Sequence, residues 1–251
     1  MKKVFYVLAM LAIASLTFSA CQKGNKAEEN KVVKRMTHYM AHWVWDGQEG
    51  VDDHAISYNA DGKVAKIERE DRSWTFTYEG NKITAAYVKE GENKDPYVFT
   101  LGDNGYVASF KDTWGDERTC EYDAEGHLLK VSKGGEKKSE LVWENGNLKK
   151  FSRYESDTWQ WKEQTFLADD NIGGVFPDCD DKAGIDRWMF EIGLFGKPSL
   201  KLLDEAAWDY EGAGVATQTY EKDKDGYVIK VTKVYGDDDP EIVEYKWEEV
   251  K

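Results

Sequence analysis

One short turn pattern recurs along this chain and constrains its fold more than any other feature. An apolar residue is followed by polar turn formers, a glycine and a second apolar residue, as from Tyr122 through Gly126 to Leu128. A type I turn that ends in a left-handed residue favours glycine there, because only glycine takes positive φ without a Cβ clash. The outer apolar residues then face each other across two antiparallel strands. Each copy of the pattern therefore predicts a β-hairpin tip.

Five more copies follow the same scheme. Two have the same seven-residue form, two are one residue shorter, and the last is predicted to have a loop two residues longer that reaches back to Tyr220. They occupy residues 58–64, 101–107, 78–83, 143–148 and 220–228. Between Gly62 and Gly146 the tip glycines lie 18 to 25 residues apart, which is the length of two ordinary strands with their turns. The spacing predicts an all-β, antiparallel up-and-down meander of about fifteen strands.

The apolar pattern leaves the shape of this meander open. Strands after the seven-residue tips carry apolar residues on both faces, as in Val64, Ala65 and Ile67. Either a β-bulge resets the face after each tip, or both faces are partly covered. Covering is favoured, because the insertion described next needs a surface to pack on. We therefore expect a partly closed barrel or a long curled sheet.

The regular pattern stops at residues 168–212, which we interpret as a helical insertion. Apolar residues recur there at helical spacing, and a glycine and a proline follow them. The pattern predicts a helix over about 180–196 that covers an open end or a face of the sheet. Its apolar positions are Ile185, Trp188, Met189, Ile192 and Phe195.

The N-terminus has the form of a lipoprotein signal peptide. A basic start precedes an apolar run of 15 residues, which is too short to span a bilayer as a helix. Phe18-Ser19-Ala20-Cys21 resembles a lipobox; the alternative is an ordinary cleavage site with a coincidental cysteine. We predict a signal peptide over 1–20, lipidation of Cys21, a flexible tether over 21–31 and a single β domain over 32–251. Several acyl chains on one cysteine make membrane anchoring stable.

The chain is acidic, with 34 Lys and Arg against 48 Asp and Glu and a formal net charge of −14. Removal of residues 1–20 takes away two lysines and no acid, so the charge becomes 32 − 48 = −16. Nucleic-acid binding needs clustered cations, so no nucleic-acid partner is expected. Anionic lipid head groups would also repel such a domain. The lipid is therefore the only membrane contact that we predict.

No cofactor or metal site is predicted. His38 and His42 fall on a strand, where four residues span about 13 Å, too far apart for one metal ion. Asp223–Gly226 lacks the later acid of a calcium loop and is assigned to a hairpin turn. Two cysteines remain in the β domain, Cys120 in a predicted strand and Cys179 in the insertion. They either form a disulfide between insertion and sheet or stay free thiols.

Tryptophans are the strongest candidates for ligand contact. Trp43 with Trp45, and Trp159 with Trp161, are pairs two residues apart that share a face of a strand. An exposed pair would form a flat platform on which sugar rings stack, whereas a buried pair belongs to the core. The need for large residues inside the sheet favours the core. Trp114 sits in a predicted turn, where burial is harder, and is the best single candidate for contacting a partner.

Several features together resemble a known group of proteins. The aromatic-Asp-x-x-Gly-x-aliphatic tips resemble YD-type repeats. With the lipobox and the stretch Gly193-Leu194-Phe195-Gly196, they make the chain similar to uncharacterised Bacteroides lipoproteins with a porin-like β fold. The resemblance implies the fold and a lipid anchor in the outer membrane, on either its inner or its surface-exposed face. It carries no catalytic residues over.

These features favour a lipid-anchored cell-envelope protein that binds a glycan or a protein, or acts as a scaffold, without catalysis. An envelope hydrolase that uses carboxylates and a purely structural surface module are the alternatives. The sequence has no Gly-x-Ser-x-Gly elbow and no phosphate-binding loop. Its strands lack a continuous apolar band for lipid contact, so a true outer-membrane porin is not expected.

Overall fold

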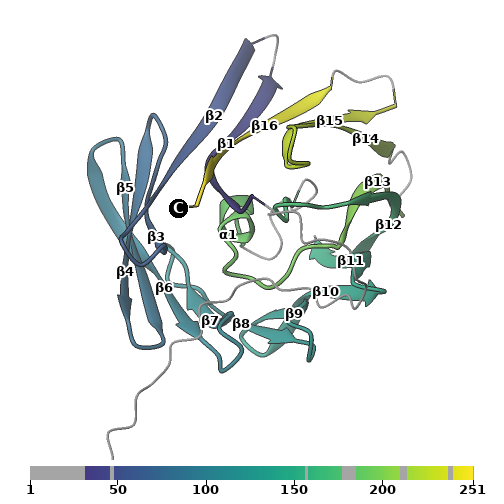
Figure 1. Ribbon diagram of the computed structural model, residues 1–251. Helices are drawn as coiled ribbons and strands as arrows, with labels where there is room; N and C mark the ends of the chain where they lie inside the picture. Colours follow the sequence, from purple (N-terminus) through teal and green to yellow (C-terminus); the bar gives the residue numbers. More distant parts are fainter. Residues whose placement is uncertain are drawn as a thin grey trace, which may run out of the picture. The chain divides into compact units, whose positions relative to one another are not determined.

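The computed structural model describes residues 32–45, 48–155, 158–176, 185–209, 214–236 and 240–250. The chain divides into two units, Met1–Lys31 and Val32–Lys251, and every described residue belongs to the second. Over the described residues, this unit is a closed barrel of sixteen antiparallel strands with one short helix (Figure 1). The antiparallel meander is confirmed. Pairing of the first strand with the last closes the barrel, so it is neither partly open nor a curled sheet.

The elements follow one another in sequence as neighbours in the barrel. They are β1 (Lys34–Trp45), β2 (Gln48–Tyr58), β3 (Val64–Glu68), β4 (Arg72–Glu79), β5 (Lys82–Lys89), β6 (Glu92–Leu101), β7 (Val107–Lys111), β8 (Glu117–Tyr122), β9 (Leu128–Lys133), β10 (Glu136–Glu144), β11 (Asn147–Glu155), β12 (Thr158–Asp170), α1 (Arg187–Glu191), β13 (Lys201–Trp208), β14 (Val215–Lys222), β15 (Val228–Tyr235) and β16 (Glu241–Glu249).

The hairpin tips form as the glycine pattern predicts. The tip glycines Gly62, Gly105 and Gly126 take φ of 75°, 81° and 94°, the left-handed region that the turn requires. The expected pairs across the strands are confirmed. They are Tyr58–Val64, Leu101–Val107, Tyr122–Leu128, Tyr78–Ile83 and Trp143–Leu148.

A β-bulge follows every seven-residue tip. Tyr122 pairs with Leu128, whereas Glu121 pairs with Lys130, so one residue of β9 is extra. The same shift follows the tips of the β2–β3, β6–β7 and β14–β15 hairpins. The bulge resets the inward face, and Leu128 and Val131 are both buried three residues apart. The expectation that both faces of these strands are covered is therefore wrong.

The β14–β15 tip has the same turn as the others. Asp223 N donates to Tyr227 O at 2.9 Å, and Gly226 N donates to Asp223 O at 3.1 Å, the pattern seen in the β8–β9 tip. Strand pairing already resumes at Lys222 and Val228. The longer loop predicted here is wrong.

Successive turns alternate between the two ends of the barrel. One end, which we call the glycine-tip end, carries the turns after β2, β4, β6, β8, β10 and β14 and the start of β1. The opposite, return-turn end carries the turns after the odd-numbered strands β1, β3, β5, β7, β9, β11, β13 and β15. The described chain therefore begins at the glycine-tip end.

The described parts of the segment between β12 and β13, residues 171–176 and 185–200, lie inside the barrel and form much of its core. Ile185, Met189 and Phe195 are almost completely buried. The Phe195 ring contacts two rings of the wall, Phe110 at 5.3 Å and Phe99 at 6.3 Å between centroids. Figure 1 shows α1 within the ring of strands. The insertion therefore fills the barrel and does not cover it from outside.

The helix is shorter than the sequence predicts. It spans Arg187–Glu191, not about 180–196, and part of the predicted range, 180–184, lies outside the described residues. Gly193 and Gly196 take φ of 78° and 96° and end the helical path. β13 also lies inside the predicted 168–212 insertion. The apolar spacing was misleading because these side chains meet the barrel wall on several sides. No helix in the described part of the chain is long and apolar enough to span a membrane.

The outward face of the barrel is polar. In β4, Trp74 and Phe76 are buried, whereas the alternating Thr75 and Thr77 are exposed. Ion pairs join neighbouring strands on this outer face, with N–O distances of 2.5 to 3.0 Å. Examples are Glu121–Lys130 and Glu221–Lys230. The barrel thus has a mostly apolar interior and a charged exterior.

Candidate functional site

All five tryptophans proposed for ligand contact lie toward the return-turn end. Trp43 and Trp45 are among the last three residues of β1, and Trp114 lies in the turn after β7. Trp159 and Trp161 are in the first four residues of β12, just after the β11–β12 turn. The side chains of Trp43 and Trp45 are outside the described part of the structure. The topology places all five backbone positions at the end opposite the start of β1.

A well-ordered turn presents the Trp114 side chain to solvent, with 82% of the residue exposed. Asp112 is buried, and its Oδ1 accepts hydrogen bonds from Trp114 N at 3.0 Å and Asp116 N at 2.9 Å. Arg118 Nη1 donates to the second carboxylate oxygen of Asp112 at 2.5 Å. These bonds fix the backbone of the turn, from which the Trp114 side chain extends into solvent. This exposure fits the role predicted for Trp114.

The second tryptophan pair lies on the outside of the barrel. Trp161 is 38% exposed, and its neighbours Lys162 and Gln164 are the buried, inward residues of β12. The core interpretation is therefore wrong for Trp161. Trp159 shares the outward face and meets Tyr154 of β11, with ring centroids 5.6 Å apart. We call Tyr154, Trp159 and Trp161 the aromatic ledge.

Tyr154 was not singled out from the sequence. It lies on the strand before the β11–β12 turn and pairs directly with Trp159 across that turn. The signal was available, since residues equally distant from a return turn face the same side of a hairpin. Pairing residues at equal distances from a return turn predicted near Glu155 would have placed Tyr154 opposite Trp159.

A buried charged network attaches α1 to the barrel wall. Arg187 Nη2 donates to Tyr245 Oη at 2.9 Å, and that hydroxyl donates to Glu191 Oε1 at 3.0 Å. The Arg187 guanidinium lies 4.9 Å from the Tyr39 ring centroid. Burial raises the pKa of Glu191, and the opposing attraction of Arg187 favours its charged form. The network joins α1 to β1 and β16, which makes it a structural tie.

A row of rings lies inside the wall beside this network. Tyr39 and His54 have centroids 5.0 Å apart, and Trp74 follows His54 at 6.2 Å. His54 Nδ1 donates to Asp52 O at 3.2 Å, because a carbonyl only accepts. Burial, and then the nearby Arg69 cation, lower the pKa of His54 to about 4. The imidazole is therefore neutral at pH 7.

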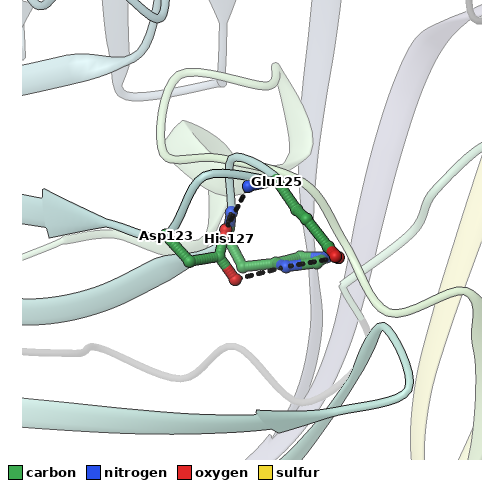
Figure 2. Close-up of side chains that lie close together, drawn as sticks. All are labelled: Asp123, Glu125 and His127. Atoms are coloured by element: carbon green, nitrogen blue, oxygen red, sulfur yellow. Dashed lines mark hydrogen bonds and ion pairs between the residues drawn. The ribbon is translucent and has the colours of Figure 1, made fainter.

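One cluster in the described residues has the composition of a metal site, Asp123, Glu125 and His127 (Figure 2). Asp123 Oδ1 accepts hydrogen bonds from the backbone N–H groups of the other two residues, at 2.9 and 2.8 Å. Its Oδ2 lies 2.8 Å from His127 Nδ1. The His127 ring stacks on Trp143 at 4.4 Å. Partial burial raises the pKa of Asp123, but the bonds from His127 outweigh it and the pKa is lowered.

Other turns use their aspartate in the same way as this cluster. The first oxygen of Asp112 and Asp223 caps two backbone N–H groups, and the second takes a cation, Arg118 or Lys34. His127 occupies that cation's place in the β8–β9 tip. The contacts within the cluster therefore stabilise the turn, and we assign no metal ion to it.

The carboxylates of the β14–β15 tip hold the start of the barrel. Lys34 Nζ lies 2.6 Å from Asp223 Oδ2 and 2.5 Å from Asp225 Oδ2. Lys34 N also donates to Tyr227 Oη at 3.0 Å. The hydrogen bonds that Lys34 donates to Asp223 and then to Asp225 raise its pKa. These oxygens are engaged by the lysine, which supports the hairpin assignment over a calcium loop.

Two cavities in the described part of the chain contain no catalytic carboxylate pair. One, of about 40 Å³, lies between the insertion and β9–β13, and its lining contains no Asp or Glu. Another, of about 260 Å³, lies beside the β10–β11 tip and has Glu144 as its single carboxylate. Glycoside hydrolysis generally needs two. These cavities therefore give no support to the hydrolase alternative.

Of the three cysteines discussed in the sequence analysis, only Cys120 lies in the described part of the structure. Cys120 is a buried free thiol in β8, and burial raises its pKa to about 12. Cys179 lies outside the described residues, so the choice between a disulfide and two free thiols is not tested. Cys21, the predicted lipidation site, also lies outside them.

No protein-family model matches the chain, and no curated protein matches it. Solved structures do share its fold. A porin-like protein from Bacteroides uniformis is 17% identical, with 85% of this chain and 98% of that chain covered and a TM-score of 0.69. A porin-like protein from Bacteroides vulgatus is 14% identical, with 86% and 99% covered and a TM-score of 0.58. The porin-like β fold implied by the sequence is thus confirmed, while membership of a lipoprotein family and the YD-type identity of the tips stay predictions.

Proposed function

We propose that this chain is a lipid-anchored cell-envelope protein whose barrel stands in water and presents its return-turn end as a glycan-binding surface. Both structural neighbours come from Bacteroides and are described as porin-like, which supports an envelope or outer-membrane location. The proposal includes membership of the Bacteroides lipoprotein family and lipidation of Cys21. Nucleic acid is not a partner, given a net charge of −14.

The observation that carries the proposal is the separation of the two ends. The described chain begins at Val32 at the glycine-tip end, and the candidate tryptophans lie toward the other. Residues 22–31 reach at most about 35 Å when extended. A lipid at Cys21 would therefore keep the glycine-tip end near the membrane and leave the tryptophans on the distant end.

The polar outer face supports a barrel in water. A membrane barrel carries an outward apolar band with a polar interior. Here the wall has charged pairs outside and large aromatic residues inside. Embedding this surface in lipid would strip water from many charges at high cost. The lipid, and not the barrel, is the proposed membrane contact.

Replacing Cys21 with alanine should release the protein from membranes. We expect the wild-type protein, made with its signal peptide in a Gram-negative host, to enter the detergent phase of a cloud-point separation and to incorporate a palmitate analogue. Cys21→Ala should enter the aqueous phase unlabelled, because the anchoring acyl chains are absent. A Cys21→Ala variant that still incorporates the palmitate analogue would show that Cys21 is not the lipidated residue.

Glycan binding is tested with the chain from residue 22 onward, which retains the complete barrel and its core. We expect at least one glycan class on an array to bind it, because exposed indole rings stack on the apolar faces of sugars. Heat-unfolded protein is the control for non-specific adhesion. If the folded chain binds no glycan, the glycan-binding function is wrong and the structural-module alternative gains support.

A further inference from the structure

We propose that the aromatic ledge on β11 and β12 is the contact site and that its ligand is an extended, uncharged polysaccharide. The inference rests on the proposed glycan-binding function and makes it specific. It assigns glycan binding to Tyr154, Trp159 and Trp161. It also uses the charges around these residues to choose between uncharged and acidic glycans.

The ledge is an aromatic strip on an otherwise polar wall. Tyr154 and Trp161 are each 38% exposed, and Trp159 lies beside both of them on the same outward face. Alternate residues of a strand lie about 7 Å apart, a spacing on the scale of successive sugar units. The strip therefore suits a ligand that is long and repetitive, such as a polysaccharide chain.

Three lysines lie over the three rings of the ledge. Lys138 Nζ is 5.0 Å from the Tyr154 centroid, and Lys137 Nζ is 5.0 Å from that of Trp159. The β9–β10 pairing shifts register between Lys137 and Ser139. This irregularity accompanies the placement of two consecutive lysines over the rings. Lys150 Nζ lies 4.6 Å from the Trp161 centroid.

Nearby carboxylates cancel the charge of these lysines. Lys137 pairs with Glu140 at 2.9 Å, and Lys138 pairs with Glu136 at 2.8 Å. Lys150 stands opposite Glu163 in the strand register. Asp209 adds a fourth carboxylate, because its Oδ1 accepts a hydrogen bond from Trp161 N at 2.8 Å. The groups around the ledge are therefore three cations against four acids, with a net formal charge of −1.

This balance favours an uncharged glycan over an acidic one. A polyanion would meet four carboxylates at the ledge and, after removal of residues 1–20, a chain of net charge −16 around it. Sugar hydroxyls, in contrast, both donate and accept, so they can bond to ammonium and carboxylate groups together. The apolar faces of the sugar rings would lie on the parts of Tyr154 and Trp161 that stay exposed beside the lysines.

The test is affinity electrophoresis of the chain from residue 22 through gels containing soluble polysaccharides. Neutral β-glucan, α-glucan, xylan and mannan are compared with the acidic polygalacturonate. The wild type should be retarded by a neutral polymer. Loss of both indoles in Trp159→Ala/Trp161→Ala should weaken that binding at least about tenfold, since each ring contributes on the order of 1 kcal/mol. Trp161→Phe, which keeps a ring, should lose less.

Two further variants separate the ledge from the rest of the barrel. Ile229→Ala removes an exposed apolar side chain from β15, away from the ledge, and should bind as the wild type does. Equal circular dichroism spectra of all variants would confirm that they fold. If Trp114→Ala abolishes binding while the double variant binds normally, the ledge is wrong but the glycan-binding function stands.

The remaining outcomes are equally decisive. Stronger retardation by polygalacturonate than by any neutral polymer would overturn the uncharged ligand class. Binding of a neutral polymer that survives the double substitution would overturn the ledge alone. If the wild type binds none of the polymers and no glycan on the array, the proposed function itself has failed.

Discussion

Replacing Phe195 with alanine is expected to lower the free energy of unfolding by about 3–5 kcal/mol. Phe195 is 1% exposed and lies in the insertion, inside the barrel. Its ring meets Phe110, Phe190 and Phe99 at centroid distances of 5.3, 5.7 and 6.3 Å. Truncation leaves a cavity that the closed wall of hydrogen-bonded strands cannot collapse to fill. The measurement is urea-induced unfolding followed by circular dichroism.

The matched control is Trp114→Ala, another aromatic residue replaced by alanine. Trp114 is 82% exposed, so its loss should change stability by no more than about 0.5 kcal/mol. A Phe195→Ala protein as stable as this control would mean that the insertion is a removable plug. The expected result instead makes the insertion the core itself, without which the wall has little to pack on.

The hairpins were predictable because their turns are specified locally. Each tip needs a glycine at one position and apolar residues at two others, and these are visible within seven residues, as from Tyr122 to Leu128. Closure of the barrel was not visible in this way. It depends on pairing of β1 with β16, for instance Tyr39 with Tyr245, about two hundred residues apart.

It was harder to predict which side chains point into the barrel and which point outward. After each seven-residue tip a bulge moves the inward face, so Val64 and Ile67 are both buried three residues apart. That spacing resembles a helix or a doubly covered strand when strict alternation is assumed. Trp161 was placed in the core for a different reason, the need for large residues inside the sheet, although β12 directs Lys162 inward.

The insertion was misread for a related reason. Helical spacing of apolar residues indicates one buried face only when the other face meets water. Inside a barrel, all sides of a segment meet the wall, so Ile185 and Phe195 are buried although only Arg187–Glu191 is helical. The ties from Arg187 and Glu191 to Tyr245 could not be seen either, because they join residues more than fifty positions apart.

Acidification should destabilise the protein through His54 by about 3 kcal/mol between pH 7 and pH 4. Burial and Arg69 lower the pKa of His54 from 6.5 to about 4. The unfolded chain therefore binds a proton more readily than the folded protein does. The contribution of His54 to stability is fully present above pH 6.5. It falls as the pH drops below that value and is completely lost below about pH 4.

The change is measured as the difference in unfolding free energy between the wild type and His54→Phe, from urea titrations at several pH values. Phenylalanine preserves the ring between Tyr39 and Trp74 but does not titrate. Carboxylates titrate in both proteins, so their contribution cancels in the difference. From pH 7 to pH 4, the unfolding free energy of His54→Phe should rise by about 3 kcal/mol relative to that of the wild type. Parallel stability curves would show that His54 is protonated in the folded barrel without cost, and that its place beside Arg69 is open to water.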